Sequence, residues 1–289
     1  MRTWLVTGAS KGLGAAIARA ALMHGDRVAI ASRQMSPAAP IFAEFPDTAL
    51  AITLDVVDPQ SIGDAIRKLD EWGGPIDVLV NNAGQGMHGA IEETSDIDLR
   101  ALFEVNFFGV AATIRAVLPS MRARGSGLII NIGSVAGFVA NPGTGAYCAT
   151  KFAMEALTEA LRKEVEGMGI KVAMIAPGGM RTGFNNSSIW QASARIEAYH
   201  STAGVRTDDL RRNAGLKGSE VGAVAAAIWD LSKMDDPPSH LILGADAMQR
   251  IDQKLSHLRS QLELANPLIE ERRRYGNGAA CIDAAGIGD

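Results

Sequence analysis

Cysteine is scarce in this chain, and no run of hydrophobic residues is long. Only Cys148 and Cys281 occur among 289 residues, and this number and separation fit neither a disulfide framework nor a metal-binding cluster. Apolar runs such as Gly109–Ala112 soon meet a charge, here Arg115, well short of the roughly 20 residues that a membrane span needs. The first apolar strand directly follows Arg2, which leaves no room for a signal peptide. We therefore expect a cytoplasmic protein with no membrane partner.

An excess of either charge is also absent. The 28 basic and 32 acidic residues give a formal net charge of −4 and are interspersed, so no basic surface is expected for nucleic acid or an anionic membrane. The five histidines, at 24, 88, 200, 240 and 257, are scattered singly. We expect them to be surface or packing residues, because zinc ligands are usually clustered. A composition of 47% hydrophobic and 21% charged residues is typical of a globular protein, and we expect its partner to be a small molecule.

Short apolar runs alternate with longer stretches of helical periodicity, and this alternation predicts a parallel sheet with helices on both faces. The predicted strands are Thr3–Thr7, Arg27–Ala31, Ala49–Leu54, Val78–Asn81, Gly127–Ile132, Lys171–Ile175 and Leu241–Leu243. The predicted helices are Gly12–His24, Pro59–Trp72, Asp96–Arg122, Tyr147–Glu166 and Ser219–Leu231, with Ser61 and Ser95 as expected caps. Seven strands predict a doubly wound α/β fold in a single domain.

The C-terminal region differs in pattern from the rest. We assign 1–250 to the main domain, which includes a variable loop at 183–215, then 251–274 to a helical extension and 275–289 to a flexible tail. The spacing of Ile251, Leu255, Leu258 and Leu262 is four, three and four residues, which marks one apolar face of a helix. Two heptads are few for a coiled coil. We therefore expect this face to pack on the main domain, with an oligomer contact as the alternative.

Polar residues and glycines follow six of the predicted strands. In a sheet of this kind, ligands bind beyond the carboxyl ends of the strands, near the point where the strand order reverses. The residues at these ends are Gly8, Arg33, Asp55, Asn82-Ala83-Gly84, Ser134, and Pro177 with Gly178. Because the ends converge on one edge of the sheet, the sequence predicts a single ligand site there.

The segment Thr7-Gly8-Ala9-Ser10-Lys11-Gly12-Leu13-Gly14 follows the first strand. Its spacing differs from the G-x-G-x-x-G dinucleotide fingerprint but meets the same need. Missing Cβ atoms let the backbone approach a pyrophosphate, and the helix beginning near Gly12 supplies free N–H groups. No acid lies between Val28 and Pro40, where an acid usually holds a free ribose 2′-hydroxyl. Arg33 and Lys11 can instead face a 2′-phosphate, so we expect NADP(H) rather than NAD(H).

Tyr147 and Lys151 are four residues apart on a strongly helical stretch, so their side chains share one face. A nearby ammonium stabilises a phenolate, and we therefore expect Lys151 to lower the pKa of Tyr147. The Tyr-x-x-x-Lys pair alone often occurs by chance. Together with the glycine segment and Ser134, it predicts acid–base chemistry beside a bound dinucleotide.

With these motifs the chain resembles the short-chain dehydrogenase/reductase family over about Arg2 to Asp246. It is most similar to the branch of 17β-hydroxysteroid-dehydrogenase-like enzymes and bacterial carbonyl reductases. The resemblance rests on the glycine segment, Asn81-Asn82-Ala83-Gly84, Asn106, Ser134, Tyr147-x-x-x-Lys151, and Pro177-Gly178 leading to Thr182. It implies a Rossmann fold and an oxidoreductase that transfers hydride between NADP(H) and a ketone or secondary alcohol of an apolar small molecule, without a metal.

The resemblance also implies a role for each site residue. Tyr147 would exchange a proton with the substrate oxygen, which Ser134 would polarise. Lys151 would bind the nicotinamide ribose, and Asn106 would hold a water in a proton relay. The expected cofactor contacts are Gly8, Ser10, Lys11, Gly12, Leu13, Gly14, Arg33, Asp55, Asn82, Ala83, Gly84, Tyr147, Lys151, Pro177, Gly178 and Thr182. Gly179 stands where many relatives have a larger residue, which implies a looser loop on the nicotinamide side.

Substrate walls are expected after the fourth and fifth strands and beyond Thr182. The candidates are Gln85, Met87, Val135, Phe138, Phe184, Trp190 and Tyr199. They suggest a mainly apolar pocket, and 184–215 is a candidate lid that would exclude water. Two other functions stay open: a catalytically silent nicotinamide-sensing protein, and a sugar-nucleotide epimerase or dehydratase of the extended branch. A homodimer or homotetramer stays open as well.

Overall fold

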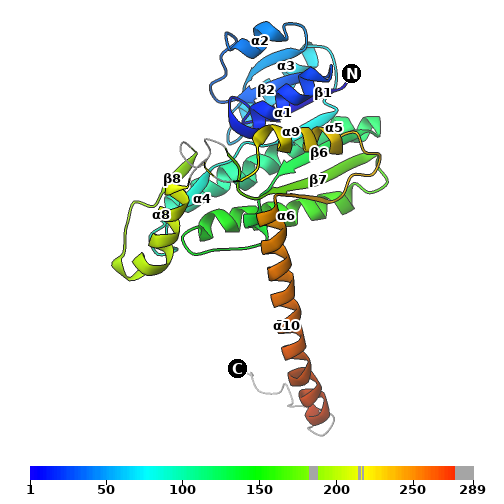
Figure 1. Cartoon of the computed structure of the whole chain (residues 1–289). Coiled ribbons are helices and arrows are strands. Elements are labelled where there is room, and N and C mark those ends of the chain that lie inside the picture. Colours follow the sequence, from blue (N-terminus) through cyan, green and yellow to red (C-terminus); the bar gives the residue numbers. More distant parts are fainter. Residues whose placement is uncertain (182–187, 214–215, 217, 277–289) are drawn as a thin grey trace, which may run out of the picture.

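The computed structural model describes residues 1–181, 188–213, 216 and 218–276. Seven parallel strands form one sheet in the order β3-β2-β1-β4-β6-β7-β9, with helices on both faces (Figure 1). The strands are β1 (Thr3–Thr7), β2 (Arg27–Ser32), β3 (Ala49–Thr53), β4 (Val78–Asn81), β6 (Gly127–Ile132), β7 (Ile170–Pro177) and β9 (His240–Leu243). All seven predicted strands are present, and the predicted doubly wound Rossmann fold is confirmed.

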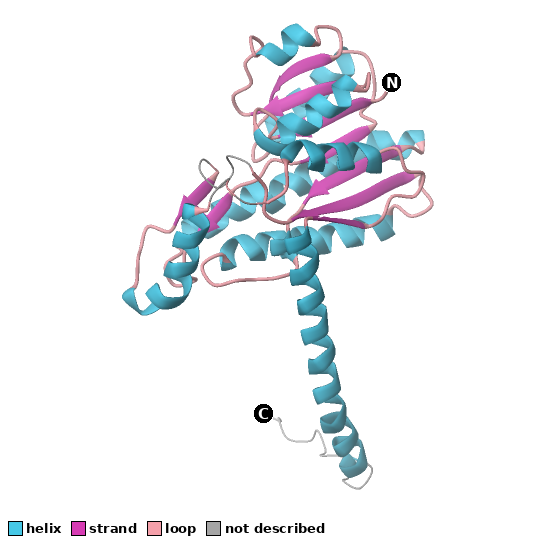
Figure 2. Cartoon of the chain, viewed as in Figure 1, coloured by secondary structure: helices cyan, strands magenta, loops and turns pink. Residues whose placement is uncertain are grey.

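The helices are α1 (Gly12–Met23), α2 (Pro40–Glu44), α3 (Pro59–Glu71), α4 (Asp96–Phe103), α5 (Gly109–Arg124), α6 (Gly145–Glu164), α8 (Val205–Arg212), α9 (Val221–Leu231) and α10 (Ala245–Gly276). Successive residues of β1 enter different apolar clusters, because side chains of a strand alternate between faces. Trp4 and Val6 pack with residues of α1 and α9, whereas Leu5 packs with residues of α3, α5 and α6. Two helical layers therefore enclose the sheet (Figure 2).

The strand order reverses between β1 and β4. β1 pairs in parallel with β2 on one side, where Thr7 lies opposite Ala31, and with β4 on the other. Right-handed crossovers from this point place helices on opposite faces of the sheet. A crevice at the carboxyl ends of β1 and β4 is the place where folds of this kind bind ligands.

The predicted helix Asp96–Arg122 is interrupted. A π-helical turn, Glu104–Phe108, separates α4 from α5 and holds the buried Asn106. Ser95 caps α4 as predicted, because its Oγ accepts from the Asp98 N–H at 3.1 Å.

The predicted cap at Ser61 is wrong. Asp58 caps α3 by accepting from the Gln60 N–H at 2.9 Å. The Ser61 Oγ instead accepts from the Asp55 N–H, so it steadies the loop after β3. Asp58 directly precedes the helix and Ser61 lies in its first turn. The spacing of polar residues alone did not show which of the two caps it.

The stretch Asp96–Arg124 is long and apolar enough, by length and composition alone, to cross a membrane. This was not expected from the sequence. Buried side chains of its second half, among them Val110, Ile114 and Met121, belong to the apolar cluster on one face of the sheet. A core helix packed on a sheet accounts for the same composition.

The segment from residue 188 onward is more regular than predicted. β8 (Ile189–Gln191) pairs in parallel with β5 (Gly86–His88) as a second, two-stranded sheet. A 3₁₀ turn at Glu197–Tyr199 and a π turn at His200–Gly204 then lead into α8. The candidate lid therefore contains defined elements, while Thr182 and Phe184 lie outside the described residues.

α10 is a single helix of 32 residues that projects from the domain (Figure 1). It begins at Ala245, before the extension predicted to start at 251. Ile251 is buried in a cluster with Val135. Leu255, Leu258 and Leu262 are 59%, 46% and 68% exposed. The prediction that this face packs on the main domain is thus correct for Ile251 and wrong for the three leucines.

A chain of buried polar side chains connects the centre of the sheet to α5 and α6. The Thr113 hydroxyl donates to Asn81 Oδ1 at 2.7 Å, and Asn81 Nδ2 donates to Asn131 Oδ1 at 2.9 Å. Asn131 Nδ2 in turn donates to Thr158 Oγ1 at 2.9 Å. All four side chains are buried. Such a satisfied network fixes one arrangement of the elements it joins.

Replacing Asn131 with alanine is expected to lower the free energy of unfolding by about 1–3 kcal/mol, because the buried Asn81 amide loses its acceptor. Urea unfolding measures the loss. Asn141→Ala, in the loop before α6, is the matched control and should change stability by less than about 0.5 kcal/mol. Equal midpoints for the two variants would contradict a structural role for the network.

Candidate active site

Gly8, Gly12 and Gly14 shape the turn between β1 and α1. Gly8 and Gly12 have φ angles of +63° and +61°, a region that favours glycine. A Cβ on Gly8 would lie 2.7 Å from the Ala83 Cα, and one on Gly14 would lie 2.4 Å from Asn82 Nδ2. At these two positions the missing Cβ makes room for the protein's own chain. A Cβ on Gly12 would meet no described atom within 4 Å, so the turn is open at this position.

Asn82 holds the glycine turn in place. Its Nδ2 donates to the carbonyl oxygens of Thr7 and Gly8, at 3.0 and 3.1 Å. The Thr7 Oγ1 accepts from the N–H groups of Asn82 and Ala83, both at 3.0 Å. The structure therefore gives Asn82 a supporting role. Its direct contact with a cofactor stays a prediction.

The start of α1 fits a dinucleotide pyrophosphate. Lys11 is the N-cap residue and makes no side-chain cap hydrogen bond, and the first turn contains no acid. The N–H groups of this first turn can therefore donate to a phosphate. Ser10 and Lys11 are exposed beside this turn, whereas Leu13 is buried.

Arg33 and Asp55 lie at the same edge of the sheet as the glycine turn. Arg33 directly follows β2 and is exposed, and Asp55 follows β3 and is half-buried. β2 and β3 are neighbours, with Ser32 opposite Thr53. The Asp55 Oδ1 accepts from the Val57 N–H at 3.1 Å, which leaves its other oxygen for further contacts.

Ser134, Tyr147 and Lys151 meet at the carboxyl end of β6. The Ser134 Oγ accepts from the Ala136 N–H at 3.1 Å and begins a 3₁₀ turn. The Tyr147 hydroxyl, on the first turns of α6, hydrogen-bonds with Ser134. Lys151 lies one turn further along, with Nζ 5.9 Å from the Tyr147 ring centroid, and donates to the Ile132 carbonyl at 2.9 Å. The structure thus brings the predicted trio together.

Burial controls the protonation of this trio. It raises the pKa of Tyr147 to about 12, against the opposing effect of the Ser134 hydrogen bond. It also lowers the pKa of Lys151 to about 8. The prediction that Lys151 lowers the tyrosine pKa is therefore wrong in direction. Desolvation of the phenolate is the largest cause of this shift, and the phenol keeps its proton at neutral pH.

Asn106 is fully enclosed and fully hydrogen-bonded. Its Nδ2 donates to the Gln85 carbonyl at 2.7 Å and to Thr150 Oγ1 at 3.0 Å. Its Oδ1 accepts from the Gln85 N–H at 2.8 Å. A Cβ on Gly84 would lie 3.4 Å from this oxygen and 3.9 Å from the Lys151 Nζ. Asn106 and Lys151 therefore border the same glycine, and Asn106 fixes the segment after β4.

Asp246 holds the loop at Gly178 and Gly179, a contact that the sequence pattern did not reveal. Its Oδ2 accepts from the Gly179 N–H at 2.9 Å, and a Cβ on Gly178 would lie 2.3 Å from its Oδ1. The Gly179 carbonyl accepts from the Ser219 N–H at 2.9 Å. The predicted looseness at Gly179 is not seen, since both of its backbone polar groups are bonded. Asp246 lies 67 residues further along the chain than Gly179, and no local pattern marks it.

The predicted substrate walls have diverse surroundings. Met87 is buried in a cluster with Tyr147 and Ala192. Val135 and Phe138 pack with residues at the base of α10. The backbone N–H of Gln85 donates to the Asn106 side chain. Trp190 is 36% exposed. The Tyr199 hydroxyl donates to Glu92 at 2.7 Å. Among the candidates that the structure describes, only Met87 is placed in a cluster with Tyr147.

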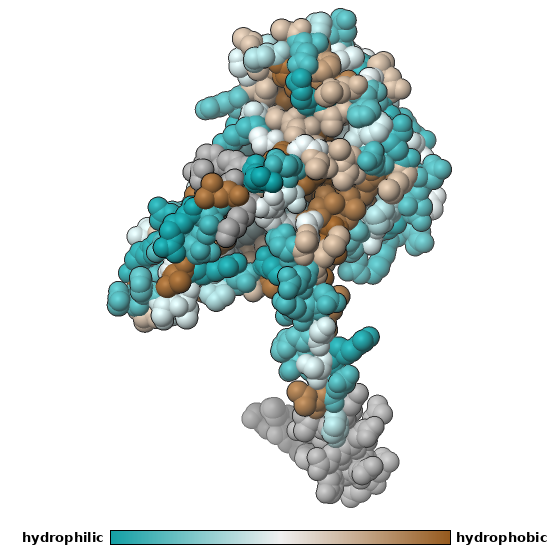
Figure 3. Space-filling view, in the orientation of Figure 1, coloured by the Kyte–Doolittle hydropathy of each residue, from teal (hydrophilic) through white to brown (hydrophobic). Residues whose placement is uncertain are grey.

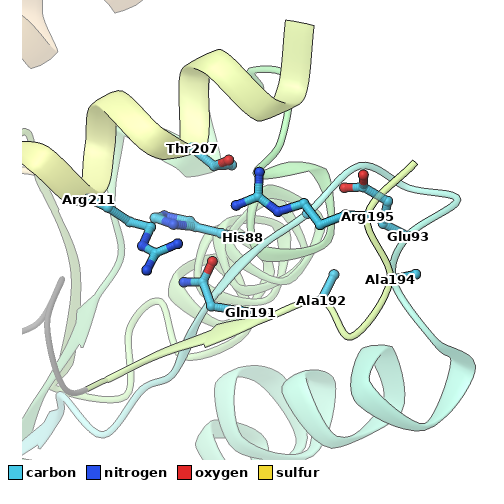
Figure 4. A pocket seen from close by; sticks show the side chains of 9 residues that line it. His88, Glu93, Gln191, Ala192, Ala194, Arg195, Thr207 and Arg211 are labelled. Carbon is cyan, nitrogen blue, oxygen red and sulfur yellow. The ribbon is translucent and has the colours of Figure 1, made fainter. Parts of the chain in front are cut away.

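A polar cavity of about 120 Å³ lies near this cluster and shares Ala192 with it. Figure 4 shows His88 and Arg211 side by side, with Gln191 next to them. His88 is 5% exposed, and its Nδ1 has no hydrogen-bond partner among the described residues. Burial, together with Arg211 and Arg206, lowers the His88 pKa to about 4, so the ring is neutral at neutral pH. The mainly apolar substrate pocket stays a prediction.

Comparisons with known proteins identify the family of this chain. Residues 2–192 match the family model described as short chain dehydrogenase. Oxidoreductase BOA17 of Botryotinia fuckeliana is 34% identical over 249 residues, which cover 86% of this chain and 90% of that protein. A short-chain dehydrogenase structure from Streptomyces avermitilis has a TM-score of 0.86 and 37% identity, covering 94% of this chain and 100% of its own.

A solved structure with bound cofactor is also similar. It is a gluconate 5-dehydrogenase from Burkholderia cenocepacia in complex with NADP and tartrate, with a TM-score of 0.71 and 29% identity. The match covers 86% of this chain and 95% of that one. On the family match and these likenesses, the chain belongs to the short-chain dehydrogenase family of oxidoreductases.

Proposed function

We propose that this chain is an NADP(H)-dependent oxidoreductase for a ketone or secondary alcohol of an apolar small molecule. The observation that carries the proposal is the hydrogen bond between Ser134 and Tyr147, with Lys151 one helical turn away. An exposed Arg33 at the end of β2 supports a cofactor with a 2′-phosphate, as does the NADP in the Burkholderia relative. When bound, the nicotinamide supplies or accepts the hydride.

The side chains supply the proton and the orientation. During reduction, the protonated Tyr147 donates its proton to the carbonyl oxygen, and the Ser134 hydroxyl donates a hydrogen bond to that oxygen. We expect Lys151, whose Nζ would lie 3.9 Å from a Cβ on Gly84, to bind ribose hydroxyls and to replenish the proton. Met87 and Ala192 beside the tyrosine favour an apolar group next to the reacting carbon.

Titration of the purified protein with NADPH and NADH, followed by reduced-nicotinamide absorbance against ketones, aldehydes and steroids, tests the proposal. Tighter binding of NADPH with turnover supports it. NADPH binding without turnover across the panel favours the nicotinamide-sensing alternative, and binding of neither nucleotide overturns both. The epimerase and dehydratase alternative carries a Gly-x-x-Gly-x-x-Gly loop, whereas this chain has Gly8-x-x-x-Gly12-x-Gly14.

Alcohol oxidation is expected to accelerate with rising pH. That direction requires the Tyr147 phenolate, and a pKa of about 12 leaves the group protonated near neutrality. Below the pKa the phenolate fraction grows about tenfold per pH unit, so oxidative kcat/KM should rise steeply between about pH 6 and 9. Reduction uses the protonated phenol, so its kcat/KM should not rise with pH. Paired pH profiles measure both directions, and an oxidative plateau near neutrality would contradict a high pKa in the working enzyme.

A further inference from the structure

The projecting part of α10 carries an apolar stripe that no described residue covers. Met248, Leu255, Leu258 and Leu262 are all largely exposed, and Figure 3 shows hydrophobic side chains among the hydrophilic ones along this helix. Beyond Ile251 the described helix has no contact with either apolar cluster of the main domain. A helix without tertiary packing is only marginally stable in water. We therefore expect another protein surface to cover this apolar stripe.

The spacing of the stripe indicates what covers it. Met248, Leu255, Leu258, Leu262 and Ala265 follow one another at seven, three, four and three residues. Ile251, three residues after Met248, completes the pattern but packs on the main domain. This is the a and d pattern of a heptad repeat, which fits the seam between two long helices. Leu264, also exposed, lies off the stripe. A narrow seam of this kind fits a helix better than a broad protein surface.

The charges beside the stripe distinguish the two orientations of a helix pair. In a parallel pair of identical helices, residues five apart at flanking positions face each other. Lys254 of each copy would then face Arg259 of the other copy, which gives two repulsive contacts. In an antiparallel pair with Leu255 against the second copy's Leu258, Asp252 faces Arg259, again twice. Opposite charges attract and like charges repel at these positions, so the sequence of α10 favours the antiparallel pair.

We propose that α10 pairs with α10 of a second copy of this chain as an antiparallel two-stranded coiled coil. The apolar seam supplies the affinity, and the two Asp252–Arg259 pairs set the orientation and register. A coiled coil formed in this way makes the protein a homodimer through its C-terminal helix. The inference does not depend on the proposed function, because it uses no residue of the catalytic trio.

Sedimentation of the full-length protein and of Leu258→Asp tests the seam. The variant is expected to halve the particle mass, because a carboxylate would be buried in the interface. Leu264→Asp on the same helix is the matched control and should keep the mass of the unmodified protein. Circular dichroism confirms that both variants fold. A monomeric unmodified protein, or a Leu258→Asp variant of unchanged mass, overturns the proposal.

A charge exchange tests the orientation. Asp252→Arg and Arg259→Asp are each expected to weaken the dimer about tenfold, since each breaks two pairs and creates repulsion. The double variant should restore the affinity. A parallel pair predicts the opposite sign for Arg259→Asp, because the new carboxylate would then face Lys254 and strengthen the dimer. That result, or no restoration in the double variant, rules out the antiparallel pair.

Discussion

Replacing Tyr147 with phenylalanine is expected to lower kcat for ketone reduction by about 10²–10⁴-fold, the contribution of one positioned general acid. Phenylalanine keeps the ring in its cluster with Met87 and Ala192. It removes only the hydroxyl that bonds Ser134 and carries the proton. Steady-state kinetics measure the loss, and nucleotide titration should show nearly unchanged binding.

The matched control for this substitution removes a hydroxyl far from the trio. Ser120 lies exposed on α5, where its Oγ accepts from Arg124. Ser120→Ala should retain the kcat of the unmodified enzyme. If Tyr147→Phe also retains it, the proton comes from another group and the assignment of Tyr147 fails.

Replacing Arg33 with aspartate is expected to reverse the cofactor preference. The guanidinium would lose its contact with a 2′-phosphate, worth about 1.5–3 kcal/mol or roughly 10- to 150-fold in affinity. The new carboxylate would also repel that phosphate while accepting from a free ribose 2′-hydroxyl. The ratio of NADPH to NADH dissociation constants measures the change.

Arg122→Asp gives the control for net charge. Arg122 lies in the last turn of α5 and is exposed, and its reversal adds the same charge away from the cofactor edge. Its nucleotide preference should match that of the unmodified protein. An unchanged ratio for Arg33→Asp would remove Arg33 from the phosphate site and favour NAD(H).

The central sheet could be predicted because each strand is a continuous apolar run between turn signals. All seven strands are long enough to show this pattern. β5 and β8 could not be predicted, because each has three residues and each exists through its pairing with the other. The π turn at Asn106 was not predicted either, since its hydrogen bonds to Gln85 and Thr150 join segments that are distant in the sequence.

The site could be predicted in position but not in its electrostatics. Ser134, Tyr147 and Lys151 are identified by local spacing and by strand ends. The direction of the tyrosine pKa depends on desolvation, which spacing does not show. Asp246 escaped prediction because its partners, Gly178 and Gly179, belong to a distant segment.

The heptad spacing of α10 predicted an apolar face correctly but not its partner. Periodicity shows that a face is apolar and says nothing of the surface that it meets. Ile251 meets the main domain. Leu255 and Leu258, on the next turns of the same stripe, do not. Only the path of the helix away from the sheet distinguishes the two cases.

Asp246 also determines how far the chain can be shortened. By secondary structure it belongs to α10, but by contact it belongs to the loop at Gly178 and Gly179. A protein ended at the last strand of the sheet would therefore lose an anchor of this loop. A truncated form made for crystallography or for assays needs to extend through Ile251, which closes the apolar cluster around Val135. The first two turns of the projecting helix are thus part of the folded main domain.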